Sequence, residues 1–384
     1  MDGALSISVV ALAGFVLPLL ASRLRLPAVV LEILFGIAIG PSILGWIHAT
    51  PEMAFLAELG FLLLMFLSGF EIDFNELRRQ GGSQIGIGLL VFVLTLFFAY
   101  KGARLLGHGP FVTLLLATTS VGLVVPTLRE GRHTATALGQ TILIAAILSD
   151  FLTLIGTTLL AMVHENGLGW NLLRFPALFA TMAVLLLSLR RLAWWFPDRF
   201  ERLFSEEDNS EIGIRASLAL MFVFVGLSHM LGVESILGAF LAGTAFAMIF
   251  RHRGALDRKL SGFSYGFFIP IFFIHVGLEF DLQALMTPGV FRGALSLIGV
   301  AIAVKLLASC ALFLKGLSPR EVLAAGILLS ARLSLVIAVA KLGSRLNLLD
   351  PALETQVVLL AVVTATLTPT LFGLIAPRKA SCES

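Results

Sequence analysis

The sequence predicts an all-α protein that crosses a membrane many times, with about thirteen transmembrane helices in a single domain over residues 1–384. Hydrophobic residues make up 58% of the chain and charged residues only 13%, and the mean hydropathy is +0.98. A soluble domain carries roughly 25% charged residues. Apolar runs of about 17–25 residues, the length that spans a bilayer, recur along the whole chain. We therefore expect an integral membrane protein with no soluble regulatory domain.

Thirteen hydrophobic segments follow one another, joined by short loops. The first does not have the features of a cleaved signal peptide, because it lacks a basic region and a small-residue cleavage site, and another segment follows at Pro27. The longest polar stretch, 196–215, separates segments seven and eight. The segment cores are 4–22, 27–46, 54–72, 83–106, 110–128, 134–163, 173–190, 211–231, 234–250, 262–280, 290–314, 319–342 and 353–376.

The positions of Lys and Arg predict the orientation of these segments. With thirteen spans and the N-terminus outside, 19 of the 27 Lys and Arg residues lie on the inner side and six on the outer side, while Lys305 and Arg332 fall inside segments. Basic residues are enriched in cytoplasmic loops. We therefore expect the C-terminus in the cytoplasm, and this topology explains the net charge of +3 without nucleic-acid binding.

An internal repeat relates two parts of the chain. Segments two and three (26–40 and 61–77) resemble segments nine and ten (231–245 and 268–285). The copies are seven segments apart, an odd number, so they have opposite orientations. Inverted-topology repeats of this kind build secondary transporters with a site near the midplane. Segments three and ten share four residues at an offset of 208: Gly69 with Gly277, Glu71 with Glu279, Asp73 with Asp281, and Leu77 with Leu285.

Segments five and twelve carry residues that weaken a helix. In 117–131 three hydroxyl residues precede glycine and proline, and 324–338 has a glycine, two serines and an arginine at its centre. Discontinuous helices at matching positions of two repeats indicate a transport site. The alternative is that the hydroxyl groups bond back to their own helices. The residues concerned are Thr118, Thr119, Ser120, Gly122, Pro126, Gly326, Ser330, Arg332 and Ser334.

Asp150 in segment six is a carboxylate inside an apolar segment, where a charge costs about 2.5–3.5 kcal/mol. Ser149 precedes it, and Thr153 and Thr157 follow on the same helical face. Such oxygens suit a partly dehydrated monovalent cation, and Asp150 can hold this cation or a proton but hardly both. The candidate site consists of Asp150, Ser149 and Thr153, Thr119 and Ser120 of segment five, and Lys305, with Arg332 as a supporting charge. The alternative is a structural ion pair between Asp150 and one of the buried cations.

Lys305 and Arg332 are those cations. Lys305 could pair with Asp150, release its own proton when a cation enters, or extend to the membrane surface. Arg332 stays charged, so we expect it to neutralise helix ends or a carboxylate. No nucleophile–base set, metal-ligand set or nucleotide motif is present, and Cys310 and Cys382 form no disulfide framework. The sequence therefore predicts neither an enzyme nor a cofactor.

Five stretches together resemble the monovalent cation:proton antiporter-2 family of bacterial Na⁺/H⁺ and K⁺/H⁺ exchangers. They are 24–46, 56–78, 267–282 and "ATTSVGLVVPTL" with "AAILSD". The resemblance implies thirteen helices, interleaved dimerisation and core subdomains, an elevator-like cycle and a homodimer in a prokaryotic inner membrane. It also implies that segments five and twelve cross, that Asp150 binds the cation or proton, and that Lys305 is the family lysine.

Three features depart from the family pattern. Ser149 stands where electrogenic members have a first Asp, which favours one-for-one electroneutral exchange. Ser334 stands where relatives often have Glu, and no nucleotide-binding domain follows. The leading hypothesis is a Na⁺ or K⁺ (or Li⁺)/H⁺ antiporter. The alternatives are a channel, which the inverted repeat disfavours, and a transport-inactive sensor, which the retained Asp150 and Lys305 disfavour.

Overall fold

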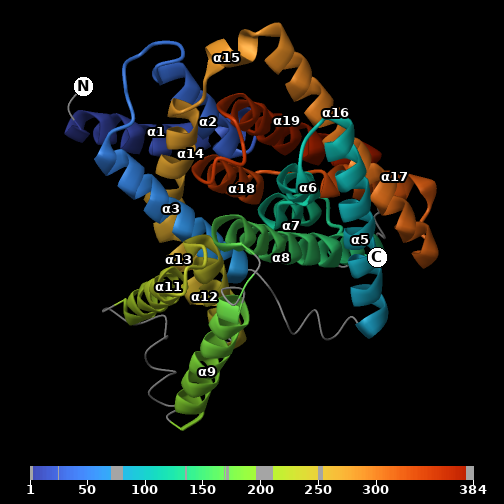
Figure 1. Cartoon of the computed structure of the whole chain (residues 1–384), viewed down its shortest axis with the longest axis horizontal. Coiled ribbons are helices and arrows are strands. Elements are labelled where there is room, and N and C mark those ends of the chain that lie inside the picture. The colour runs from blue at the N-terminus through green and yellow to red at the C-terminus, as the bar shows by residue number, and fades with distance from the viewer. Residues whose placement is uncertain are drawn as a thin grey trace, which may run out of the picture. The chain divides into compact units, whose positions relative to one another are not determined.

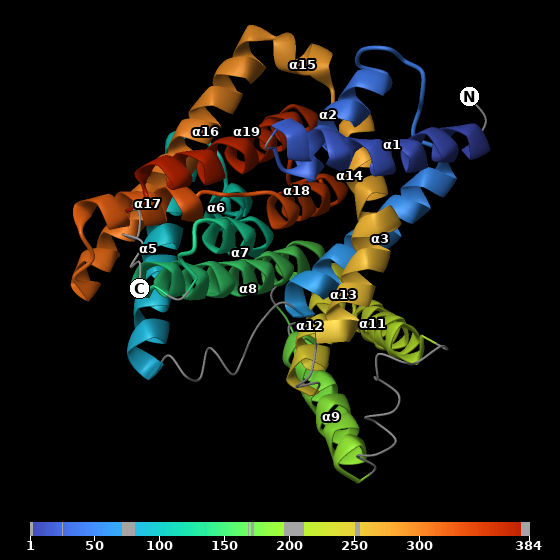
Figure 2. The same cartoon turned by 180° about the vertical axis from the view of Figure 1, so that it is seen from behind.

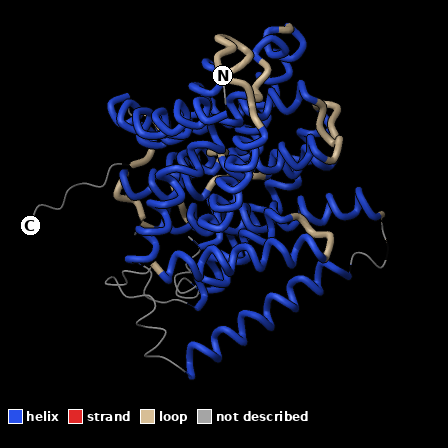
Figure 3. The backbone as a smooth tube through the Cα atoms, turned by 90° about the vertical axis from the view of Figure 1, so that its left-hand side faces the viewer, coloured by secondary structure: helices blue, strands red, loops and turns tan. Residues whose placement is uncertain are grey.

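The computed structural model describes residues 3–24, 26–70, 81–134, 136–167, 169, 173–195, 211–249 and 254–377. These residues form helices joined by loops and contain no strand (Figure 3). The all-α prediction is therefore confirmed. The chain divides into two compact units, each made from two separate stretches of sequence. Unit 1 comprises Met1–Glu76 and Thr158–Phe280, and unit 2 comprises Leu77–Thr157 and Asp281–Ser384.

Unit 1 is held together by two tight helix crossings, α2 on α14 and α3 on α12 (Figures 1 and 2). At each crossing a glycine on either helix lets the backbones touch, because a Cβ there would collide with a carbonyl group of the facing helix. The described helices of unit 1 are α1 (Gly3–Leu24), α2 (Ala28–Ile39), α3 (Pro51–Phe70), α9 (Arg174–Trp195), α11 (Ile212–Met230), α12 (Ser235–Ile249), α13 (Gly254–Phe263), the π-helical turn η2 (Ser264–Phe268) and α14 (Ile269–Leu278).

The two crossings correspond to each other through the internal repeat. Segment two packs on segment ten, and segment nine packs on segment three, as the repeat requires. Gly69 and Gly277 occupy equivalent positions in the aligned copies. The other aligned residues of the first copy, Glu71, Asp73 and Leu77, lie outside the described residues. The four contacts are Gly36 with the carbonyl of Ile274, Gly277 with that of Ile33, Gly69 with that of Phe240 and Gly243 with that of Phe66.

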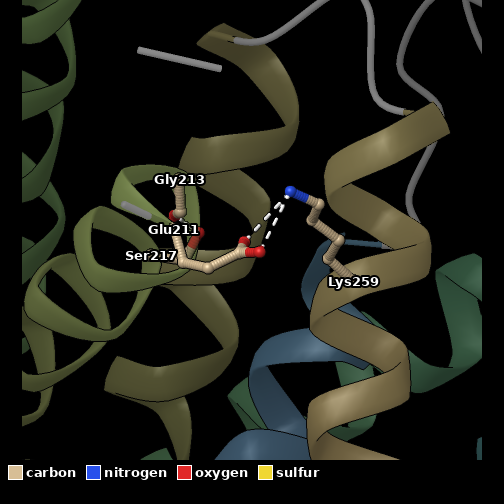
Figure 4. A network of polar contacts seen from close by, with 4 residues as sticks. All are labelled: Glu211, Gly213, Ser217 and Lys259. Atoms are coloured by element: carbon tan, nitrogen blue, oxygen red, sulfur yellow. Dashed lines mark hydrogen bonds and ion pairs between the residues drawn. The ribbon is translucent and has the colours of Figure 1, made fainter. Parts of the chain in front are cut away.

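An ion pair links the start of α11 to α13 at the surface of unit 1 (Figure 4). Lys259 Nζ lies 3.2 Å from Glu211 Oε1 and 3.1 Å from Oε2. Ser217 Oγ beside it donates to the carbonyl of Gly213 on its own helix. Because both charged side chains are partly exposed, the pair adds little to stability.

Unit 2 contains the helices that carry Asp150 and Lys305 and the break that holds Arg332. Proline opens α6, α16, α17 and α19, where its fixed φ suits the first turn and its missing N–H needs no partner. The helices are α5 (Gly81–Leu105), α6 (Pro110–Ala117), α7 (Val121–Glu130), α8 (Ala137–Asn166, its last turns in unit 1), α15 (Leu282–Met286), α16 (Pro288–Ser309), the 3₁₀ turn η3 (Cys310–Lys315), α17 (Pro319–Leu329), α18 (Ser334–Arg345) and α19 (Pro351–Ile375).

Nine stretches of described helix are long and apolar enough to cross a membrane, and α17 with α18, bent by 44°, make a tenth if they form one span. Three further expected segments fall on the shorter apolar helices Ala28–Ile39, Arg174–Leu185 and Ser235–Met248. The multi-pass prediction is confirmed, and the count of thirteen stays a prediction.

Both expected discontinuities are present in unit 2. Segment five is split into α6 and α7 by an extended stretch at 118–120, and segment twelve is split into α17 and α18 at 330–333. Pro126 does not mark the first break, because it lies inside α7. The run of three hydroxyl residues, whose side chains compete for backbone hydrogen bonds, is where the helix stops.

Candidate functional site

The two helix breaks lie against each other inside unit 2, and α18 runs beside α6 in both opposite views (Figures 1 and 2). The backbone N–H of Ser120 donates to the carbonyl of Ala331 at 2.9 Å. Thr119 Oγ1 donates to the carbonyl of Leu329 at 3.3 Å. Both hydroxyl residues are buried. The broken helices are therefore joined directly through groups that an unbroken helix would use internally.

Lys305 caps the end of α6. Its Nζ donates to the carbonyl of Ala117 at 2.8 Å and to Thr119 Oγ1 at 2.7 Å. The side chain is 1% exposed, so it does not extend to the membrane surface. The last carbonyl groups of a helix carry partial negative charge and lack intrahelical donors. The ammonium group thus compensates a helix end.

Arg332 connects the second break to the first. Nη2 donates to the carbonyl of Leu116 at 2.7 Å and to that of Ala301 at 3.1 Å. Nη1 donates to the carbonyl of Ser330 at 3.2 Å. The side chain is fully buried. The expectation that Arg332 neutralises helix ends agrees with these contacts.

Asp150 lies buried on α8, and its charge is within electrostatic range of Lys305. Ser149 Oγ and Thr153 Oγ1 are also buried, and neither has a hydrogen-bond partner among the residues that the structure describes. The hydroxyl group of Thr157 instead donates to the carbonyl of Thr153 at 2.8 Å. Buried hydroxyl oxygens without protein partners are suited to receive a ligand.

All seven predicted site residues therefore lie in unit 2 and are buried. The structure brings Thr119 into contact with Lys305, and Ser120 into contact with the second break. Asp150, Ser149 and Thr153 occupy one stretch of α8. An anionic carboxylate with neutral hydroxyl oxygens is a donor set for a hard monovalent cation.

Two kinds of participant were not found in the sequence. Apart from Thr119 Oγ1, the acceptors for Lys305 and Arg332 are backbone carbonyl groups, which have no sequence signature. Thr364 on α19 is fully buried, and its Oγ1 lies 3.3 Å from the carbonyl oxygen of Arg332. Only its place in a stripe of hydroxyl residues on the last helix could have drawn attention to it.

Comparison with known proteins shows the family of this chain. The model of the family "Sodium/hydrogen exchanger, transmembrane" matches residues 7–376. The chain is 32% identical to the putative Na⁺/H⁺ antiporter YjbQ of Bacillus subtilis over 98% of its own length, but it spans only 64% of that protein. It is 29% identical to the Na⁺/H⁺-K⁺ antiporter GerN of Bacillus cereus, covering 91% of this chain and 90% of GerN.

A solved structure supports the fold. The sodium proton antiporter MjNhaP1 of Methanocaldococcus jannaschii aligns with a TM-score of 0.67 at 17% sequence identity, covering 98% of this chain and 96% of that chain. These findings confirm the resemblance noted in the sequence. The chain belongs to the sodium/hydrogen exchanger family.

Proposed function

We propose that the chain is a secondary antiporter that exchanges Na⁺ or K⁺ for H⁺, with Asp150 binding the cation and the proton in turn. The observation that carries the proposal is the buried Asp150 carboxyl on one stretch of helix with the hydroxyl groups of Ser149 and Thr153, which have no hydrogen-bond partner within the described part of the chain. Most buried hydroxyl groups have a hydrogen-bond partner, so these two are available as ligands for a cation. The names of the relatives in Bacillus subtilis and Bacillus cereus support the same activity and both cations.

The exchange is electroneutral. Ser149 adds no second carboxylate, and the two hydrogen bonds of Lys305 go to neutral oxygens of Ala117 and Thr119. In the proposed cycle Lys305 stays bonded to these two oxygens and exchanges no ion. Asp150 is then the group whose occupant changes, and it carries one monovalent cation in one direction and one proton in the other.

The whole chain is one transmembrane antiporter domain. Unit 2, with both helix breaks, is the ion-carrying core subdomain, and unit 1 is the dimerisation subdomain of a homodimer. The protein lies in the cell membrane, with the N-terminus outside and the C-terminus in the cytoplasm. The excess of Lys and Arg on the inner side supports this orientation.

The test uses purified protein in liposomes with an imposed pH gradient. Addition of Na⁺, K⁺ or Li⁺ should produce a change in internal pH that saturates with cation concentration, and protein-free liposomes should show none. A flux that rises without saturation would indicate a channel. No pH change with any of the three cations would contradict the antiporter proposal and favour the sensor hypothesis.

A further inference from the structure

We infer that Thr364 of α19 is a positioning residue for the cation site, acting through the backbone of the second helix break. The inference rests on the proposed function. Thr364 is fully buried, and its Oγ1 lies 3.3 Å from the carbonyl oxygen of Arg332. Arg332 in turn donates to the end of α6 at Leu116, so its backbone position decides where its guanidinium group lies.

The Thr364 hydroxyl group has more than one acceptor within reach but only one hydrogen. The carbonyl oxygens of Leu360 and Ala361 on its own helix lie 2.8 and 3.4 Å away. Leu360 is four residues back in α19, so its carbonyl group already accepts the helical N–H of Thr364. For the carbonyl group of Arg332, no other donor is present among the described residues. An unpaired buried carbonyl group is costly. We therefore expect the Thr364 hydroxyl group to donate its hydrogen to the carbonyl group of Arg332.

The donors at the second break come from different elements. Thr119 and the N–H of Ser120 serve the first and third carbonyl groups of the stretch 329–332, and Arg332 itself serves the second. Thr364 serves the fourth, from α19, which is continuous over 25 residues. The donors from Thr119, Ser120 and Arg332 thus belong to the two helix breaks themselves. Thr364 instead connects the second break to α19, which is unbroken.

Thr368 provides a matched control one turn further along α19. It is buried like Thr364, and its Oγ1 donates to the carbonyl of Thr364 at 2.7 Å, within its own helix. Removing its hydroxyl group makes the same chemical change at a neighbouring position of the same helix. No hydrogen bond to the break is lost with it.

The test measures the apparent KM for the cation, and the maximal rate per folded protein, from cation-dependent internal pH changes in liposomes. Thr364→Val should raise the KM about tenfold, because an unpaired carbonyl group lowers the population of the binding-competent break. Thr364→Ser, which keeps the hydroxyl group, should restore the wild-type KM. Thr368→Val should leave the KM unchanged.

Other outcomes would overturn the inference. An unchanged KM in Thr364→Val with a lower yield or rate would mean that the residue is merely structural, and equal KM increases in Thr364→Val and Thr368→Val would mean general loosening of α19. If Thr364→Val does not fold, Thr364→Ala and Thr364→Ser are compared, and equal KM values overturn the inference. Absence of exchange in the wild type overturns the proposed function as well, which distinguishes the two failures.

Discussion

The two helix breaks of unit 2 differ in what holds their carbonyl groups. At the first break, Arg332 donates to the carbonyl of Leu116 and Lys305 to that of Ala117, so both partners are cations from other segments. At the second break, three of the four donors are neutral: two groups of the first break and one hydroxyl group of α19. Charged side chains thus bond to the last two carbonyl groups of α6, whereas the carbonyl groups of the second break are held mainly by neutral donors.

This difference explains why a membrane-embedded site keeps two cations beside one carboxylate. The end of a helix concentrates partial negative charge, and a buried cation needs several acceptors to offset its lost hydration. The end of α6 and the charges of Lys305 and Arg332 satisfy each other. The cations are thus bonded to the helix end, and in the proposed mechanism Asp150 is the group that exchanges its occupant.

The largest effect is expected for Asp150→Asn. The amide keeps the size of the side chain but binds neither a proton nor a cation, so exchange should be abolished while the protein remains folded. Cation-dependent pH changes in liposomes and a thermal unfolding curve in detergent check both parts. Thr157→Val on the same helix is the control and should keep its activity, because the Thr157 hydroxyl group bonds to its own helix. Full exchange by Asp150→Asn would refute the site.

The second-largest effect is expected for replacement of Arg332, which bonds to carbonyl groups at both breaks. Arg332→Gln leaves the carbonyl groups of Leu116 and Ser330 without donors among the described residues, whereas the carbonyl group of Ala301 lies inside α16 and keeps its helical N–H donor. Each unpaired buried carbonyl costs about 1–3 kcal/mol, so both the unfolding temperature and the exchange rate should fall. Arg332→Lys should not rescue either, because a single ammonium group cannot reproduce the planar fork. Rescue by Lys would show that only the charge matters.

Lys305→Met should have a smaller effect on stability than Arg332→Gln, because one helix-end carbonyl, that of Ala117, loses its donor. Lys305→Gln can still donate to Ala117 and Thr119, so exchange should be retained in part and should stay insensitive to membrane potential. Thermal unfolding and liposome flux compare the two variants. Equal and complete loss of exchange in both would mean that the lysine charge itself takes part in the cycle.

The smallest effect is expected for Ser149→Ala. Loss of one cation ligand of hydrogen-bond strength, about 1 kcal/mol, should raise the apparent KM for the cation about fivefold. Stability should not fall, because the Ser149 hydroxyl group has no partner among the described residues. A KM equal to that of the wild type, together with a lower unfolding temperature, would remove Ser149 from the site.

Much of this arrangement could be predicted from the sequence. The charges inside apolar segments are rare enough to stand out, and the hydroxyl run at 118–120 interrupts the helix as expected. Pro126 was a weaker guide than the hydroxyl residues, because a helix that has just restarted can include it. The hydroxyl groups at 118–120 compete for backbone hydrogen bonds and so interrupt the helix. Pro126 only lacks an N–H, which does not end α7.

The remaining features depend on distances between segments. Five threonines of α19 have hydroxyl groups within hydrogen-bond distance of a carbonyl group of their own helix, and only the structure separates Thr364, which is also within reach of the carbonyl group of Arg332. In unit 1 the aligned Gly69 and Gly277 were evident from the repeat. The sequence did not show that Gly69 contacts the backbone of α12 or that Gly277 contacts the backbone of α2.

The most direct test of the central claim is the response of wild-type exchange to membrane potential. Purified protein in liposomes would receive Na⁺ under a fixed pH gradient, with the potential clamped at zero, inside-negative and inside-positive values, beside Asp150→Asn. If Asp150 alone changes its occupant, the wild-type rate of internal pH change should be the same at all three potentials and absent in the variant. A rate that follows the potential would mean that a second group, with Lys305 the first suspect, changes its charge during the cycle.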